Sequence, residues 1–184
     1  MPDNGKFPTA YQNLDIKKLL RVYDTGPQRI KQILEGLSEN ELKMYPREGK
    51  WSIFQIIVHL ADSEIMGAAR IRQTFTQADR RFALYDQNVW AEVFDYQNMD
   101  MAAFYNAIKL FETLRLTTSA IFHKATESDW QKTGIHPEIG EVSLRNLLEL
   151  YADHSERHIS QIMECRQLLD KSINIPMLLE TRLY

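Results

Sequence analysis

The placement of glycine and proline constrains the fold of this 184-residue chain more than any other feature. Its seven glycines and six prolines gather between long segments in which apolar residues recur at helical spacing, and few segments alternate as strands do. We therefore expect four long helices, over residues 15–37, 52–78, 100–124 and 143–170. Four amphipathic helices of this length, joined by long connecting loops, predict an all-α four-helix bundle.

Capping residues mark the expected helix starts. A capping box, in which a serine and a Glu or Gln three residues later satisfy backbone donors reciprocally, occurs at Ser38–Glu41 and at Ser52–Gln55. Ser143 is the expected N-cap of the last helix, and Trp51 should fill the end of the bundle as a hydrophobic staple. Within the first helix, the step Gly26-Pro27 should cause a kink or a break because proline lacks an N–H group.

The remaining segments are expected to hold little regular structure. These are residues 79–98, apart from a short helix at about 88–94, then the loop 129–142 and the tail 171–184. The whole chain, residues 1–184, fits one domain with a helical core at about 15–170.

Composition excludes several classes of protein. The net charge of −3 and the pI of about 6.0 argue against a nucleic-acid binder, which carries a basic surface. One cysteine allows no internal disulfide, which is compatible with a reducing compartment. The N-terminus lacks the pattern of a signal peptide, and no run reaches the ~18 apolar residues that a membrane span needs. We expect a cytoplasmic protein without nucleic-acid or membrane partners.

The stretch YADHSERHISQI places His154 and His158 one helical turn apart. At 100° per residue both fall within the apolar stripe of the last helix, whereas Asp153, Glu156 and Arg157 fall outside it. Residues at i and i+4 have Cβ atoms roughly 6 Å apart, so two imidazoles can reach one metal ion. The alternative is a pair of core histidines whose ring nitrogens are satisfied by hydrogen bonds.

His59 is the best third ligand, because it lies at the edge of the apolar stripe of the second helix. Three neutral imidazoles with an open position suit zinc or nickel, with manganese or iron as alternatives. The zincin motif is absent because Ser155, not glutamate, follows His154. Cys165 lies two turns (~10.5 Å) beyond His158, and we interpret it as a small buried hydrophobe.

Two segments resemble the DinB superfamily, and especially its YfiT-like members. They are REGKWSIFQIIVHLADSE at 47–64 and IHPEIGEVSLRNLLELYADHSERHISQI at 135–162. The resemblance implies a four-helix bundle with a divalent-metal site whose ligands are His59, His154 and His158. Members of this superfamily are described as metal-dependent hydrolases or as transferases in which the metal activates bacillithiol, mycothiol or a similar thiol.

The expected function is therefore that of a metal-dependent S-transferase, which joins a small thiol to an electrophilic small molecule. A hydrolase that uses a metal-activated water is the first alternative, and a non-enzymatic bundle that binds a metal or a small ligand is the second. The pattern also leaves open a homodimer through exposed helix faces.

Residues near the expected ligands have two interpretations each. Ser63 and Asp62, at i+4 and i+3 from His59, could orient its imidazole; periodicity favours Ser63, and Asp62 could equally be a solvated carboxylate. Arg70 could hold an anionic substrate, although a surface salt bridge is the expectation we favour.

Four further residues are weaker candidates. His136 could overhang the site or make a structural hydrogen bond, and His123 should favour the C-terminal end of its helix dipole. Tyr85 and Trp90, in the long second connection, could form the wall of a pocket.

Overall fold

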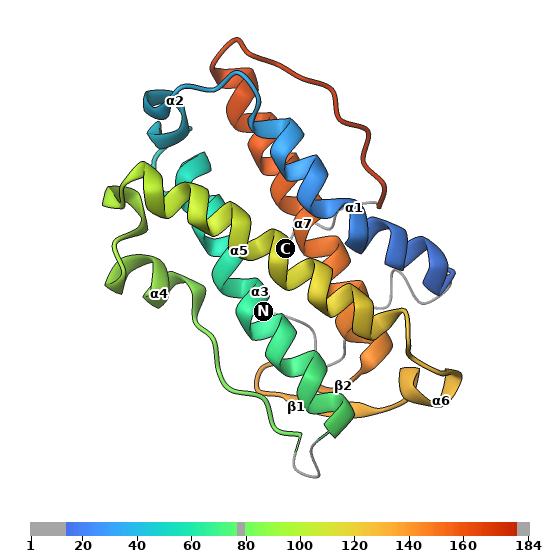
Figure 1. The fold of residues 1–184 in the computed structure, drawn as a ribbon. Coiled ribbons are helices and arrows are strands. Elements are labelled where there is room, and N and C mark those ends of the chain that lie inside the picture. The colour runs from blue at the N-terminus through green and yellow to red at the C-terminus, as the bar shows by residue number, and fades with distance from the viewer. Residues whose placement is uncertain (1–13, 77–79, 180–184) are drawn as a thin grey trace.

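The main body of the protein is a bundle of four long helices. The structure is a computed structural model that describes residues 14–76 and 80–179. The long helices are α1 (Ile16–Leu34), α3 (Ile53–Thr76), α5 (Met101–Phe122) and α7 (Leu144–Leu168). Both α1 and α3 pack against α5 and α7, so the four helices surround one interior (Figure 1). The all-α four-helix bundle is confirmed, with helix ends within a few residues of those expected.

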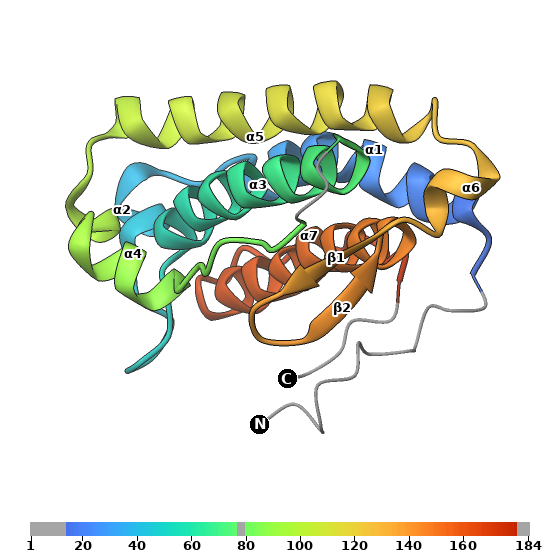
Figure 2. The same cartoon turned by 90° about the horizontal axis from the view of Figure 1, so that it is seen from below.

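Shorter elements connect these helices. They are α2 (Glu39–Lys43), α4 (Gln87–Val93), the 3₁₀ helix η2 (Tyr96–Asn98), α6 (Glu127–Trp130), β1 (Thr133–His136) and β2 (Gly140–Ser143). The expectation of a loop over 129–142 was wrong, because β1 and β2 pair as an antiparallel hairpin beside α7 (Figure 2). Strands of four residues are too short to show a convincing alternation in the sequence.

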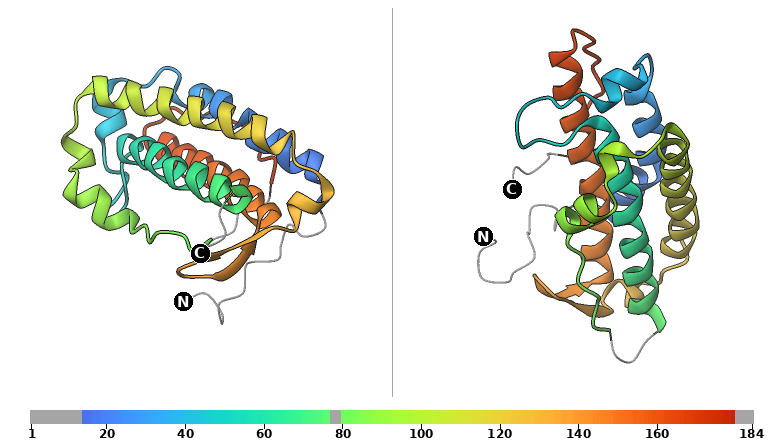
Figure 3. Two further views of the ribbon diagram at one scale, coloured as in Figure 1. Left: turned by 60° about the horizontal axis from the view of Figure 1, so that its bottom comes forward. Right: turned by 90° about the vertical axis from the view of Figure 1, so that its left-hand side faces the viewer.

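The connection between α3 and α4 is held against this hairpin. Ile135 N donates to Arg80 O at 2.8 Å, and Phe82 N donates to Ile135 O at 2.9 Å. The connection then runs along α3 and α7 toward α4, as the two views of Figure 3 show. The segment that follows α3 is therefore placed over the same two helices that carry the three candidate ligands.

Helix α1 is not broken at Pro27, contrary to one of the two outcomes expected for the Gly26-Pro27 step. Proline cannot donate to the carbonyl four residues earlier, which leaves Tyr23 O free. Arg115 Nη1 on α5 donates to this oxygen at 3.3 Å. Gly26 allows the close approach, since a Cβ there would lie 3.1 Å from Ser155 Oγ. Gly26 and Pro27 thus allow α1 to contact both α5 and α7 at this point.

A buried polar layer divides the apolar core into two clusters. One cluster contains Ile53 and Phe104, and the other contains Ile71 and Leu147. Between them, Arg115 Nε donates to Glu64 Oε2 at 2.6 Å, Tyr23 Oη donates to Glu64 Oε1 at 2.5 Å, and Arg115 Nη2 donates to Tyr151 O at 2.6 Å. No helix formed by residues 14–76 and 80–179 is both long and apolar enough to span a bilayer.

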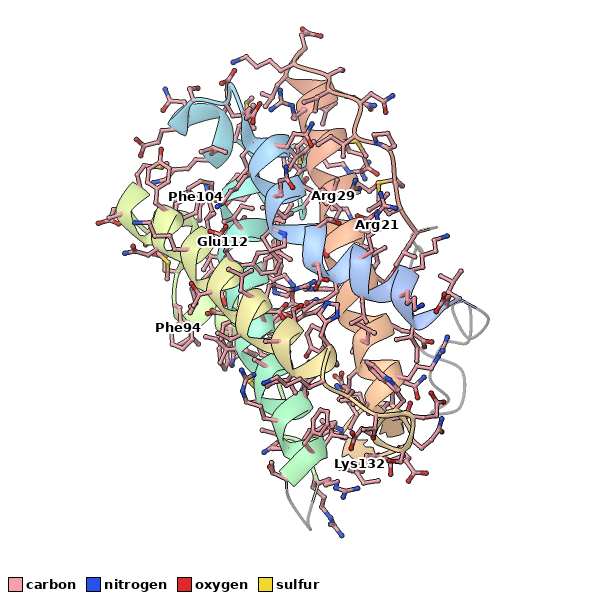
Figure 4. All side chains as sticks on the ribbon, turned by 45° about the vertical axis from the view of Figure 1, so that its right-hand side comes forward. Arg21, Arg29, Phe94, Phe104, Glu112 and Lys132 are labelled. Atoms are coloured by element: carbon pink, nitrogen blue, oxygen red, sulfur yellow. The ribbon has the colours of Figure 1, made fainter. Side chains whose placement is uncertain are left out.

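The outer side of α7 is covered as well, which sequence periodicity did not predict. Glu156, expected outside the buried stripe, is 0% exposed, and Asp153 is also buried. The Glu156 carboxylate accepts hydrogen bonds from Arg29 Nε at 2.9 Å and from Leu178 N at 2.6 Å. Figure 4 shows Arg29 on α1, on the side that faces the C-terminal segment 171–179. The C-terminal segment, which the sequence did not place, therefore contributes to the burial of Glu156.

Candidate metal centre

The structure brings the three predicted histidines together. His59 comes from α3, and His154 and His158 come from successive turns of α7. His154 Nε2 lies 3.1 Å from His59 Nε2 and 3.0 Å from His158 Nε2. One ligand nitrogen from each residue lies within 4.8 Å of the others, the spacing that a single ion can bridge. His59 and His158 are buried, while His154 is partly exposed and gives the cluster a side toward solvent.

Burial keeps these imidazoles neutral. It lowers the pKa of His59 and His154 well below the ordinary value, and the neighbouring histidines lower both further. Burial, followed by the charge of Arg157, lowers the pKa of His158 to about 4. A neutral imidazole offers one nitrogen lone pair, which is the form that binds a metal ion.

Hydrogen bonds at the second ring nitrogens set which nitrogen faces the cluster. His158 Nδ1 donates to Gln161 Oε1 at 2.8 Å, so the lone pair of the neutral ring is on Nε2. His59 Nδ1 lies 3.1 Å from Tyr85 Oη. Among the described residues, His154 Nδ1 is buried without a partner. A lone pair directed into a group of converging nitrogens suits a cation, so the donor set fits a divalent metal ion.

Aromatic rings enclose His59. The Trp51 ring lies 5.0 Å from the His59 ring between centroids, so Trp51 does more than cap the bundle. The Tyr85 ring stacks on His59 with an interplanar angle of 8°, and Trp90 contacts Tyr85 edge-on at 4.9 Å. Tyr85 and Trp90 therefore lie beside the cluster, and their expected role as the wall of a pocket stays a prediction. Trp51 also lines a hollow of about 420 Å³, together with Tyr45 and residues 47–50.

Two tyrosines connect Asp62 to His59. Within the described chain, neither Asp62 nor Ser63 hydrogen-bonds His59, and Tyr85 occupies that place instead. Tyr96 Oη donates to Asp62 Oδ2. Tyr96 is also hydrogen-bonded to Tyr85, and this bond lowers the pKa of Tyr85. Burial, followed by the Asp62 charge, outweighs it, so the pKa of Tyr85 is raised overall. Sequence reasoning missed this role of Tyr85 because it lies in the connection, where helical periodicity gives no direction.

Arg70 does not form the surface salt bridge that we favoured. It is 5% exposed, and its Nη1 and Nη2 donate to Tyr151 Oη at 3.3 Å and to Ala83 O at 3.0 Å. His136 is buried in β1, and its Nδ1 accepts a hydrogen bond from Glu138 N at 3.2 Å. Burial and then Arg70 lower the pKa of His136 to about 4. The structural hydrogen bond expected as one reading of His136 is present.

The other two candidates lie away from the cluster. His123 is exposed at the C-cap of α5, and its Nε2 lies 2.9 Å from Asp24 Oδ2. Cys165 is buried, and burial is the main cause that raises the pKa of its thiol to about 11, which agrees with a small buried hydrophobe.

A four-helix bundle with three neutral imidazoles converging in its interior defines a class of metal-centred helical bundles. This chain belongs to the DinB superfamily, whose family profile matches residues 23–162.

The chain is also similar in sequence to named proteins. The chain is 28% identical over 148 residues to YfiT of Bacillus subtilis, covering 80% of this chain and 82% of that protein. It is 29% identical over 161 residues to a protein of Bacillus licheniformis, covering 87% and 90%. Both relatives are named as candidate metal-dependent hydrolases.

Solved structures agree on the fold. The structure of YfiT from Bacillus subtilis, described as having an unusual four-helix bundle topology, matches with a TM-score of 0.78 and 27% identity. The match covers 85% of this chain and 88% of that chain. A mycothiol-dependent maleylpyruvate isomerase matches with a TM-score of 0.66 and 14% identity, covering 84% of this chain and 63% of that chain, and shares the fold.

Proposed function

We propose that this protein is a divalent-metal-dependent enzyme that transfers a low-molecular-weight thiol to an electrophilic small molecule. His59, His154 and His158 are its metal ligands. The convergence of their three neutral imidazoles is the observation that carries the proposal. Three protein ligands leave open positions for a substrate, and imidazole nitrogen suits zinc or nickel, with manganese or iron as alternatives.

The residues around the cluster favour a thiol as the activated group. A divalent ion bound there supplies a Lewis acid that lowers the pKa of a thiol or a water in an open position. Among the described residues, the converging ligand atoms include no carboxylate that could serve as a general base. A thiol, whose ordinary pKa is about 8.5, needs much less help to ionise than water does. Trp51 and Tyr85 shield His59 from water, and Gln161 orients His158.

Hydrolysis is the second candidate. It is supported by the names of the relatives from Bacillus subtilis and Bacillus licheniformis. It would require a group that accepts a proton from water near the cluster. Tyr85 Oη lies 3.1 Å from His59 Nδ1, but its raised pKa keeps the phenol protonated near pH 7, so it cannot accept a proton from water.

The test begins with the metal content of protein purified without a His-tag or chelator. We expect about one equivalent of metal in the wild type, a loss in His154→Ala, and no loss in the matched control His123→Ala, whose ring lies at the surface. Metal-loaded protein is then offered 1-chloro-2,4-dinitrobenzene with bacillithiol, mycothiol, cysteine, coenzyme A or glutathione. Release of nitrophenol from p-nitrophenyl esters without thiol measures hydrolysis.

Each result selects one reading. Thiol-dependent turnover that His154→Ala abolishes supports the transferase. Thiol-independent ester cleavage with the same loss supports the hydrolase. Metal binding without either activity leaves a non-enzymatic metal-binding bundle. Failure to bind any divalent ion after reconstitution refutes the ligand assignment.

A further inference from the structure

Arg70 is a buried cation that has no acidic partner in the part of the chain that the structure describes. Its side chain is 5% exposed, and its hydrogen bonds go to the hydroxyl of Tyr151 and the carbonyl of Ala83, both uncharged groups. Within residues 14–76 and 80–179, no carboxylate pairs with Arg70, and its Nε has no acceptor. A buried charge is strongly unfavourable unless it is paired and fully hydrogen-bonded. The described part of the fold alone does not explain why a charged side chain is kept at this position.

Other buried arginines of the bundle are compensated. Arg115 pairs with Glu64 through Nε and Oε2 at 2.6 Å. Arg166 donates to backbone carbonyls at the end of α1, at 3.0 Å from Ile33 O and 2.9 Å from Glu35 O. The charge of Arg70 thus remains in excess next to the polar layer, where Glu64 already neutralises Arg115.

Tyr151 places this charge beside the three-histidine cluster. Its hydroxyl accepts from Arg70 Nη1 at 3.3 Å, and its ring centroid lies 6.5 Å from that of His154. Gly67 on α3 makes room for the ring, since a Cβ there would lie 2.5 Å from Tyr151 Cε1 and Cζ. Arg70 and His154 therefore both contact Tyr151. Among the described residues, each has one buried nitrogen without a partner, Arg70 Nε and His154 Nδ1.

The guanidinium of Arg70 has one edge that is only half used, because Nε lacks an acceptor among the described residues. The Nε–Nη2 edge of arginine is one that binds a carboxylate through two parallel hydrogen bonds. Ala83 O occupies Nη2 at 3.0 Å, and the Phe82 ring lies 5.9 Å from Arg70 Cζ. Ala83 and Leu84, in the connection after α3, are exposed. A carboxylate that accepts from Nε would replace the Ala83 carbonyl at Nη2.

We propose that Arg70 is the centre of an anion-binding subsite, which receives a carboxylate of the small molecule activated at the three-histidine cluster. This inference rests on the proposed function and narrows its substrate class to carboxylated thiols. Tyr151 positions the guanidinium through its hydroxyl. The subsite would explain why the fold retains a buried charge that the described residues leave unpaired.

The test uses protein loaded with Co²⁺, whose thiolate charge-transfer absorption reports a thiol at the metal. Mercaptocarboxylic acids of increasing chain length are titrated beside the mercaptoalcohols of equal length. At the best-fitting length, we expect the wild type to bind the acid about ten- to a hundredfold more tightly than the alcohol, as charge-assisted bonding requires. Arg70→Met should abolish this preference.

Arg72→Met is the matched control. It lies on the same helix, where Arg72 Nη1 donates to Ala68 O and to Thr118 Oγ1, both at 3.0 Å, and it should keep the preference for acids. Urea unfolding provides a readout independent of the metal. Arg70→Met should be as stable as the wild type or more stable, because it removes an unpaired buried charge. Marked destabilisation would overturn the proposal, since it would make Arg70 a structural residue.

The remaining outcomes separate this inference from the proposed function. Equal binding of acids and alcohols by the wild type, or a preference that Arg70→Met retains, overturns the subsite while the thiol chemistry stands. If no thiol produces the cobalt band, the proposed function fails, and propionate then tests the subsite alone. An increase in melting temperature with propionate in the wild type, absent in Arg70→Met, supports the subsite; no increase overturns it.

Discussion

Replacing Tyr85 by phenylalanine should weaken metal binding without removing a ligand. Tyr85 Oη lies 3.1 Å from His59 Nδ1, and the two rings stack. Phenylalanine retains the ring and deletes only the hydroxyl. His59 then keeps its place in α3 but loses the hydrogen-bond partner that orients its imidazole.

The magnitude follows from burial. His59 is 1% exposed, so its Nδ1 would lose a partner in a largely dry environment, at a cost of about 1–3 kcal/mol. Tyr85 is only half-buried, which gives water some access and places the cost near the lower end of this range. A loss of about 1.4 kcal/mol corresponds to a tenfold increase in the metal Kd. The same size of effect is typical for groups that orient a metal-binding histidine.

Competition with a chromophoric chelator measures the Kd for Zn²⁺ directly. Tyr105→Phe is the matched control, because Tyr105 is 56% exposed on α5, away from the cluster. We expect Tyr85→Phe to bind zinc about tenfold more weakly than both the wild type and Tyr105→Phe. Equal Kd values for the three proteins would refute the assignment of Tyr85 as the residue that orients His59.

Asp62 should act on the metal only through this tyrosine. Asp62→Asn weakens the acceptor of the Tyr96 hydroxyl, which is linked in turn to Tyr85. In the wild-type background we expect a smaller loss of zinc affinity than Tyr85→Phe causes. In the Tyr85→Phe background we expect no further loss of zinc affinity, because the hydrogen bond between Tyr85 and His59 is already absent. Additive effects would show that Asp62 acts on the centre by another route.

Three further outcomes are expected. Gly67→Ala should lower the free energy of unfolding in urea by about 1–3 kcal/mol, because its Cβ would lie 2.5 Å from the Tyr151 ring; a change below about 0.5 kcal/mol would contradict this. The pKa values of His136 and His158, about 4, lie below the unfolded value near 6.5, so the unfolded chain binds protons first. The metal-free protein should therefore lose stability as pH falls from about 6.5 toward 4, by at most about 1.4 kcal/mol per pH unit for each histidine. Urea unfolding at a series of pH values measures this loss. A urea midpoint that does not change over this range would be inconsistent with neutral buried rings. Iodoacetamide at pH 8 should alkylate Cys165 at least about a hundredfold more slowly in the folded than in the unfolded protein, because burial raises the thiol pKa to about 11.

Helical periodicity was enough to predict the bundle because its signal extends over many turns. The capping boxes at Ser38–Glu41 and Ser52–Gln55 are formed as expected, and Ser143 caps α7 by accepting from Asn146 N at 3.1 Å. The hairpin at 133–143 was missed because its strands are short and depend on contacts with the connection after α3. Contacts between segments distant in sequence leave no local pattern to detect.

In the candidate site too, the residues on periodic helices could be predicted from the sequence, and those that depend on distant contacts could not. The three histidines could be predicted because i,i+4 spacing and an apolar stripe fix where a helical side chain points. The roles of Tyr85 and Arg70 could not, since Tyr85 lies in a non-helical connection and Arg70 is covered by that connection. Glu156 was placed outside the buried stripe because the C-terminal segment that covers it carries no periodic signal.

The polar layer gives a physical reason why imidazoles from two helices can meet with such close spacing. Arg115 on α5 binds Glu64 on α3 at 2.6 Å and the carbonyl of Tyr151 on α7 at 2.6 Å, so one guanidinium fixes α3 and α7 relative to each other. Glu64 is five residues from His59, and Tyr151 is three residues from His154. An apolar contact at this level would tolerate sliding of the two helices, whereas charged hydrogen bonds have narrow distances and angles. A metal ligand displaced by a fraction of an ångström would lose coordination. We therefore infer that the buried ion pair aligns the three candidate ligands.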